Sequence, residues 1–103
     1  MARKELMVRL MPYRPKEPLK GPIKLSTLWR FKAQRKKQDG TPKTTKPDTD
    51  NMIKLLKDCM TQCGFWVDDA QIYDETTIKI WSTSPGISII IDGEEEGGVQ
   101  DGN

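Results

Sequence analysis

The chain has 103 residues and a net charge of +2, and with 35% hydrophobic and 31% charged residues it is expected to form one small globular domain rather than a disordered chain. It contains no histidine, so histidine triads, Cys/His catalytic pairs and zinc sites that use histidine are excluded. No apolar run is long enough to cross a bilayer, and the start lacks the apolar core of a secretion signal, so we expect a cytoplasmic protein without a membrane partner.

The first predicted elements are a short helix and a strand. Residues 3–11 can form a helix in which Leu6 and Leu10 belong to one apolar face, and the prolines that follow stop it. Residues 23–31 alternate between two faces with the period of a strand that buries one side. Residues 32–47 are rich in Lys and Arg, contain Gly and Pro, and lack large apolar residues, so we expect a long mobile loop that orders only on a ligand.

The clearest helical pattern covers residues 51–62, with Thr49 or Asp50 as its expected cap. Gly64 can end this helix in a left-handed conformation. Cys59 and Cys63 lie four residues apart on one helix face, which favours two reduced thiols over a disulfide.

Two β-rich segments, residues 76–82 and 87–91, flank Ser84-Pro85-Gly86 and predict a hairpin. The acidic, glycine-rich residues 93–103 are expected to be a disordered tail after a single domain of residues 1–92. The expected fold class is α+β: a small mixed sheet of about four strands with two helices packed on one face.

Charge is divided sharply between the two halves of the chain. Residues 1–47 carry 14 Lys or Arg and 3 Asp or Glu, a net charge of +11, whereas residues 48–103 carry 3 Lys and 12 Asp or Glu, a net charge of −9. This division is expected of a polyanion-binding half joined to a half rich in oxygen ligands. The alternative is solvated surface charge with an acidic tail, which is the commoner origin of charge clusters.

Two pairs of aspartates flank the helix of residues 51–62. Asp48 and Asp50 precede it, and Asp68 and Asp69 follow it after one short apolar segment. Each pair alone is more simply a helix cap or a turn. Two or three of these carboxylates converging beside a basic surface would form an all-oxygen site suited to Mg²⁺ or Mn²⁺. A helix of about a dozen residues spans roughly 18 Å, so convergence requires the chain to double back.

The combined pattern is more specific than its parts. Lys46-Pro47-Asp48-Thr49-Asp50-Asn51, then Lys54, Asp58, Gly64 and Val67-Asp68-Asp69-Ala70-Gln71, resembles the signature of RusA-type Holliday junction resolvases: P-D-x-D-N-x-x-K, a helical D and a closing D-D-x-Q. The resemblance is strong over residues 46–71 and extends more loosely from Gly21-Pro22 to the C-terminal strands. It implies a RusA-like fold.

Site residues follow from this resemblance position by position. Three aspartates match the family's metal-binding and catalytic acids: Asp48, Asp50 and Asp69. Lys54 matches the catalytic lysine, which holds the scissile phosphate or offsets charge that develops on it. Supporting positions are Asp68, Asn51, Asp58 and Gln71, with Asp58 expected to orient Lys54 from the next turn.

The resemblance also implies an activity and its partners. The family uses Mg²⁺, for which Mn²⁺ is a possible substitute, to hydrolyse phosphodiester bonds of four-way DNA junctions, and acts as a homodimer that makes paired nicks. It is bacterial or phage-derived, so the expected location is the nucleoid. Basic residues expected to contact backbone phosphates are Arg30, Lys32, Arg35, Lys36, Lys37, Lys43 and Lys46.

Family members usually begin with an N-terminal strand, whereas residues 1–92 open on the segment that would follow it. We therefore interpret the chain as a shortened or divergent member whose dimerisation, DNA affinity or activity can be impaired. Alternative functions are a nuclease selective for flaps or forks, a catalytically impaired module that binds branched DNA, and a basic protein-interaction domain.

Overall fold

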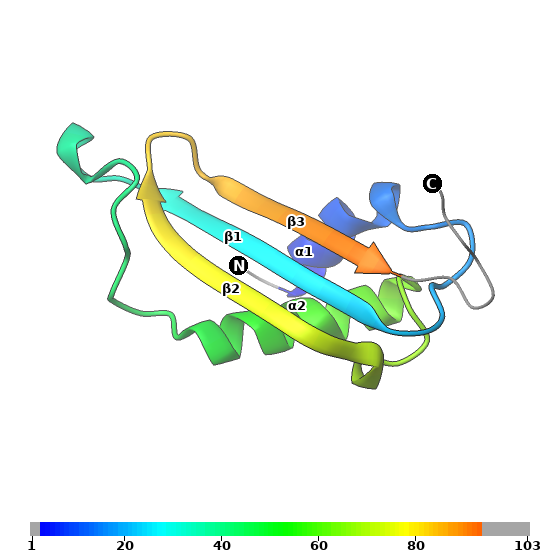
Figure 1. Ribbon diagram of the computed structural model, residues 1–103. Coiled ribbons are helices and arrows are strands. Elements are labelled where there is room, and N and C mark those ends of the chain that lie inside the picture. The colour runs from blue at the N-terminus through cyan, green and yellow to red at the C-terminus, as the bar shows by residue number, and fades with distance from the viewer. Residues whose placement is uncertain (1–2, 94–103) are drawn as a thin grey trace.

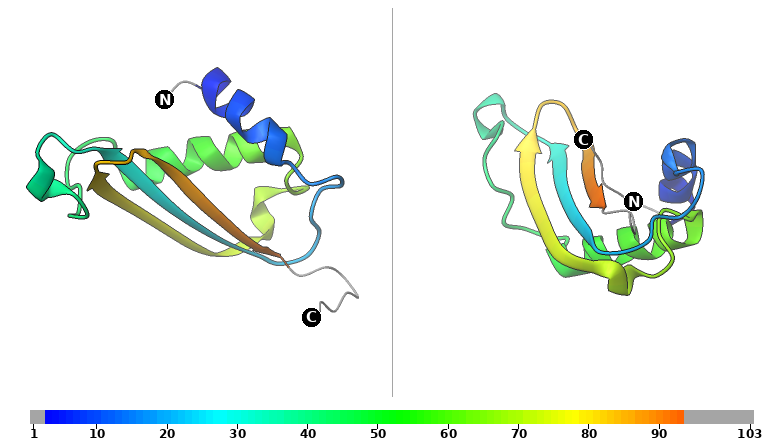
Figure 2. Two further views of the ribbon diagram at one scale, coloured as in Figure 1. Left: turned by 90° about the horizontal axis from the view of Figure 1, so that it is seen from above. Right: turned by 45° about the vertical axis from the view of Figure 1, so that its right-hand side comes forward.

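The computed structural model describes residues 3–93 (Figure 1). Two helices and three strands follow one another in the order α1 (Arg3–Leu10), β1 (Ile23–Lys32), α2 (Thr49–Cys63), β2 (Ile72–Ser82) and β3 (Gly86–Gly93). Short 3-10 helices lie at Met11–Tyr13, Lys36–Gln38 and Asp69–Gln71. The views in Figure 2 show both helices on one side of the sheet. The α+β class is confirmed, with three strands in the described residues in place of about four.

The sheet has the order β2-β1-β3, so β1 is central. It pairs in parallel with β2 and antiparallel with β3. The predicted hairpin is therefore wrong, because the two strands on either side of Ser84-Pro85-Gly86 lie on opposite sides of β1 and do not pair with each other. Antiparallel pairing with β1 sets Ile87 opposite Trp29 and Ile91 opposite Leu25, so the isoleucines of β3 extend the apolar face that β1 turns towards the helices.

The core lies between the sheet and α2. The alternation predicted for β1 is confirmed, since Ile23, Leu25, Thr27 and Trp29 are buried and the residues between them are not. From α2, the buried residues are Met52, Ile53, Leu56, Cys59 and Met60. Because these residues recur at intervals of three or four positions, their side chains lie on one face of the helix. Burial of that stripe in a core cluster shared with β1 and α1 fixes how α2 lies against the sheet.

Helix α2 begins earlier than its pattern predicts. Asp48 occupies the N-cap position in an extended conformation, but no side chain forms a capping hydrogen bond, so the expected cap by Thr49 or Asp50 is wrong. The C-terminal prediction is confirmed: Gly64 has φ 87°, a left-handed conformation that glycine adopts without steric cost.

The basic segment that follows β1 is held against the edge of β2. The Gly40 amide donates to the Trp81 carbonyl at 2.8 Å, and the Lys43 amide donates to the Lys79 carbonyl at 3.1 Å. The Thr83 amide donates to Asp39 Oδ1 at 2.7 Å. The expectation of a segment without fixed structure is therefore wrong for residues 39–43, because an edge strand offers unpaired backbone groups that a neighbouring chain can satisfy.

Both cysteines are free thiols, as predicted. Cys59 is fully buried, and this burial raises the pKa of its thiol, with smaller contributions from neighbouring charged groups. We expect an alkylating reagent at pH 8 to label Cys63 at a measurable rate and Cys59 only after unfolding, because the thiolate is the reactive form. Mass spectrometry of labelled Cys59→Ser and Cys63→Ser variants checks this; equal labelling rates in the folded protein would contradict the burial of Cys59.

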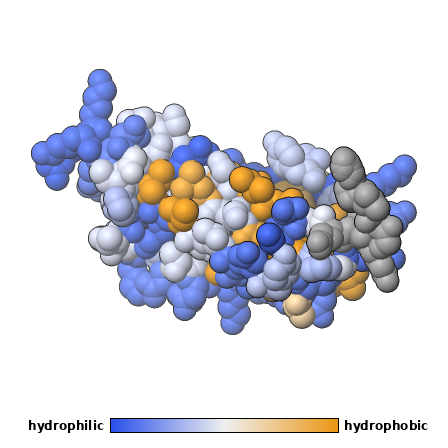
Figure 3. Space-filling model, viewed as in Figure 1, coloured by the Kyte–Doolittle hydropathy of each residue, from blue (hydrophilic) through white to orange (hydrophobic). Residues whose placement is uncertain are grey.

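The sheet face opposite the helices is open. Figure 3, in the orientation of Figure 1, shows hydrophobic residues over the strands on this face. Ile78 of β2 and Ile90 of β3 are 48% and 66% exposed. Within residues 3–93, neither α1 nor α2 has the length and apolar character that a membrane-crossing helix requires.

Candidate functional site

The first pair of predicted site residues lies at the N-terminal end of α2. The segment before the helix is anchored by Lys79 of β2, whose Nζ donates to the carbonyl of Thr45 and, at 2.6 Å, to that of Pro47. The motif did not indicate this role of Lys79. The alternation of residues 76–82 places Lys79 on the helix-facing side of the strand with Trp81, but local spacing does not reveal which segment it contacts.

Asp48 and Asp50 are both exposed. Asp48 forms an ion pair with Lys46 at 3.2 Å, and its side chain makes no capping bond to the helix. The positive end of the helix dipole stabilises carboxylates at this position. Neither carboxylate therefore takes the simpler role of helix cap, and both are exposed to solvent, with Lys46 beside Asp48.

Lys54 and Asp58 lie on the same face of α2 as Asp50, about one and two turns further along the helix. Lys54 lies four residues after Asp50, which on a helix puts the two side chains above one another. Lys54 is exposed and Asp58 is partly exposed, on the side of the helix away from the core. The ion pairs among residues 3–93 do not include one between Lys54 and Asp58, so the expected orientation of Lys54 by Asp58 within one chain is not observed.

The second pair of aspartates lies at the other end of α2. Asp68 Oδ1 accepts a hydrogen bond from the Ala70 amide at 2.9 Å and so caps the 3-10 helix Asp69–Gln71. Together with Asp58, Asp69 lines a hollow of about 420 Å³, whose other lining residues are Arg3, Thr61, Gln62, Val67 and Asp68. Arg3 is the one basic residue among those that line this hollow.

Gln71 is a structural clamp. Its Oε1 accepts from the Val67 and Asp68 amides at 2.9 Å, and its Nε2 donates to the carbonyls of Leu19 and Gly21 at 3.1 and 3.0 Å. All four hydrogen-bonding positions of the amide are therefore used. The sequence motif identified the residue but not this role, which needs the approach of a segment about 50 residues away.

Replacing Gln71 with alanine is expected to lower the free energy of unfolding by about 2 kcal/mol or more, because four backbone groups lose their partner. Gln62→Ala is the matched control, since Gln62 is exposed and its side chain donates or accepts no hydrogen bond within residues 3–93. Urea denaturation of both variants checks the prediction. Equal stability of the two variants would show that the clamp contributes nothing.

The two aspartate pairs do not meet within one chain. Asp48 and Asp50 adjoin the first turn of α2, whereas Asp69 adjoins its last turns at Thr61 and Gln62. In the described part of the chain, no three Asp, Glu or Cys side chains lie close enough to hold a metal ion. The predicted convergence is therefore not observed in one copy, because the chain after Gly64 turns back into β2 beside the C-terminal half of the helix.

The basic residues predicted to contact phosphates differ in accessibility. Lys43 is 8% exposed: its ammonium lies 4.4 Å from the centroid of the Trp81 ring and 5.1 Å from that of Phe31, and it donates to the Lys46 carbonyl. The ammonium of Lys43 is therefore occupied by contacts within the protein, and Lys43 is not one of the residues that can contact DNA phosphates. Arg30 is partly buried on the open face of the sheet. Five residues are exposed: Lys32, Arg35, Lys36, Lys37 and Lys46.

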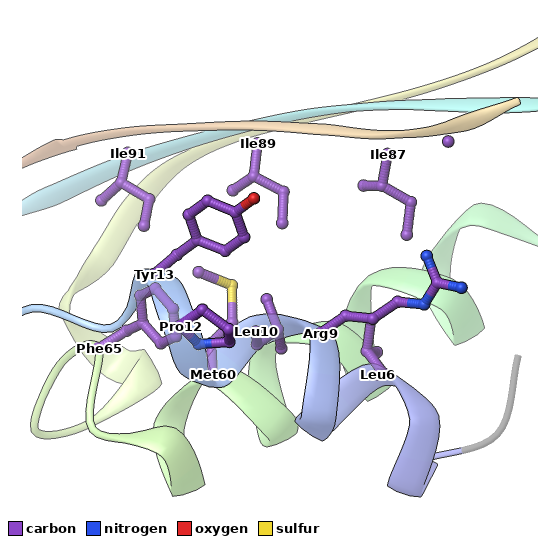
Figure 4. A pocket seen from close by; sticks show the side chains of 11 residues that line it. Leu6, Arg9, Leu10, Pro12, Tyr13, Met60, Phe65, Ile87, Ile89 and Ile91 are labelled. Carbon is purple, nitrogen blue, oxygen red and sulfur yellow. The ribbon is translucent and has the colours of Figure 1, made fainter. Parts of the chain in front are cut away.

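A cavity of about 660 Å³ is separate from the aspartates. It lies between α1 and β3, where Leu6 and Leu10 face Ile87, Ile89 and Ile91 (Figure 4). Its walls are mostly apolar, with Arg9 at one end. Phosphodiester chemistry needs charged groups, so this cavity does not belong to the candidate site.

Comparison with known proteins agrees with the motif. The family model for Endodeoxyribonuclease RusA matches residues 2–92. A crossover junction endodeoxyribonuclease RusA of Lactococcus phage r1t is 39% identical over 69 residues, which are 65% of this chain and 53% of that protein. A protein of the same description from Escherichia coli strain K12 is 40% identical over 45 residues, or 44% of this chain and 38% of that protein.

The matched part of the chain thus spans about half or less of the length of these relatives. The family match nevertheless covers nearly every residue that the structure describes. It includes both aspartate pairs, Lys54 and Gln71. The chain belongs to the RusA endodeoxyribonuclease family.

Proposed function

We propose that the chain is a subunit of an endonuclease that resolves Holliday junctions, hydrolysing DNA phosphodiester bonds with Mg²⁺ and making paired nicks as a homodimer. The observation that carries this proposal is the exposed acidic and basic face of α2, where Asp48 and Asp50 make no helix cap and Lys54 follows one turn later. Family membership supports the same activity.

The predicted metal ligands are Asp48, Asp50 and Asp69, with Mn²⁺ as a possible substitute for Mg²⁺. Hard oxygen ligands suit either ion, and the absence of histidine leaves carboxylates as the natural choice. When bound, the cation would supply an activated water and offset charge on the phosphate oxygens. One chain alone does not bring these three carboxylates together.

The other residues act on the DNA. Lys54 is exposed and can hold the scissile phosphate by a fixed positive charge. The exposed cations near the α2 N-terminus, Lys46 among them, can contact the backbone on either side of the cut. Such contacts release counterions, so affinity should fall steeply with salt.

The experiment that tests the proposal compares a four-way junction, a flap, a fork and a linear duplex of equal length, each with Mg²⁺. Symmetric nicks confined to the junction support the proposal, and preferential cutting of the flap or fork supports the structure-selective alternative. Binding that survives EDTA without any cleavage in Mg²⁺ or Mn²⁺ would replace both with a binding module. Absence of junction binding at low salt would leave only a protein-interaction domain.

A further inference from the structure

Three successive backbone carbonyls lie directly before helix α2, and each accepts a hydrogen bond from a lysine ammonium. Lys79 of β2 donates to the carbonyls of Thr45 and Pro47. Lys43 donates to the carbonyl of Lys46 at 2.6 Å. The segment that carries these carbonyls runs beside β2 down to the start of α2 (Figure 1). The hydrogen-bond ladder of the helix begins after them, so the two lysines supply the partners that the helix does not.

The two lysines are themselves held in place at the edge of β2. The Lys43 amide donates to the Lys79 carbonyl at 3.1 Å, and the Lys43 ammonium lies 4.4 Å from the centroid of the Trp81 ring. Neither lysine forms an ion pair with a carboxylate within residues 3–93. Both positions lie outside the motif of residues 46–71. Packing at the strand edge therefore directs both ammonium groups at the segment before α2.

A lysine as buried as Lys43 is a costly choice for packing alone. Burial of an ammonium costs solvation and side-chain entropy, whereas a methionine would fill the space beside Phe31 and Trp81 without that cost. What lysine adds is three hydrogen-bond donors. The carbonyls that receive them lie within three residues of Asp48, whose backbone is extended and whose side chain makes no capping bond. The lysines thus fix the backbone from which the Asp48 carboxylate extends.

We propose that Lys43 and Lys79 are positioning residues for the metal ion. By holding residues 45–47 they set where the carboxylates of Asp48 and Asp50 lie. Mg²⁺ demands near-ideal geometry at about 2.0–2.1 Å, so a ligand displaced by about 1 Å holds it more weakly. Neither lysine needs to touch the ion or the DNA. The inference rests on the proposed function for the role of the two aspartates as metal ligands.

The direct test measures the Mn²⁺ affinity of the folded protein without DNA, by electron paramagnetic resonance. Lys79→Met keeps the length of the side chain and removes its donors, so it should weaken Mn²⁺ binding by about tenfold or more. Lys79→Arg keeps the charge and the donors and should bind Mn²⁺ more tightly than Lys79→Met. Lys57→Met is the matched control, because the Lys57 ammonium donates to Glu75 of β2 at 2.7 Å rather than to residues 45–47. Its Mn²⁺ affinity should equal that of the wild type.

A second measurement follows the backbone itself with no metal present. NMR order parameters of residues 45–50 should fall in Lys79→Met and stay unchanged in Lys57→Met. Lys43→Met should act in the same direction as Lys79→Met. Because both lysines hold one segment, the double variant should lose less Mn²⁺ affinity than the product of the two single losses.

The outcomes separate this inference from the proposed function. A Lys79→Met variant that loses no more Mn²⁺ affinity than Lys57→Met would overturn the inference, even if it unfolds more easily. Loss of affinity with unchanged order parameters at residues 45–50 would also overturn it. If the wild type binds Mn²⁺ and Lys79→Met binds it weakly with a more mobile segment, but the wild type leaves junctions uncut, the proposed function is refuted and the inference stands.

Discussion

Replacing Asp50 with asparagine is expected to lower the rate of junction cleavage by about 100-fold or more while leaving the protein folded. Asparagine keeps the size of the side chain and removes the charge that holds a cation. Asp50 is exposed and takes no part in capping α2, so the change should not affect unfolding. Single-turnover cleavage of a four-way junction at saturating Mg²⁺ measures the effect.

A second prediction for the same variant concerns its affinity for the junction. Clustered carboxylates repel phosphate, so Asp50→Asn should bind the junction in EDTA as tightly as the wild type or more tightly. Asp74→Asn is the matched control, because Asp74 is also exposed but lies on β2 outside the motif. Cleavage by Asp50→Asn at the rate of Asp74→Asn would contradict the site assignment.

The largest effect on stability is expected for Leu56→Ala, which should lower the free energy of unfolding by about 2–5 kcal/mol. Leu56 is fully buried in the centre of the α2 stripe and belongs to the core cluster that also contains residues of α1 and β1. Small domains are stabilised by only about 5–15 kcal/mol, so this variant should be partly unfolded well below the wild-type melting temperature.

Leu55→Ala is the matched control for Leu56→Ala, since the same atoms are removed from the next residue of the same helix. Leu55 is only partly buried, so its substitution should cost clearly less. Urea unfolding followed by circular dichroism measures both. Equal losses would mean that α2 does not pack through the face described above.

Local patterns predicted most of the elements. The alternation of β1, the stripe of α2 and the left-handed Gly64 each depend on residues close in sequence, and each is observed. The pairing partner of β3 depends instead on which neighbour completes the apolar face over the helices. Alternation alone does not distinguish pairing with β2 from pairing with β1, and the predicted hairpin failed for that reason.

In the candidate site, too, the sequence predicted the features that depend on local spacing and missed those that depend on long-range contacts. The motif identified Asp48, Asp50 and Lys54, whose neighbours lie within two turns of helix. It did not indicate the burial of Lys43 between Phe31 and Trp81, or the anchoring of residues 45–47 by Lys79. Those roles arise where the basic segment folds onto the edge of β2, a long-range contact that no local spacing encodes.

The most direct measurement of the central claim is the cleavage of a four-way junction by the unmodified chain across a Mg²⁺ titration. We predict two symmetric nicks that appear with Mg²⁺, disappear with EDTA and return when the ion is restored. Cleavage that is unaffected by EDTA, or an intact junction at every Mg²⁺ and Mn²⁺ concentration despite tight binding, would contradict a metal-dependent junction nuclease.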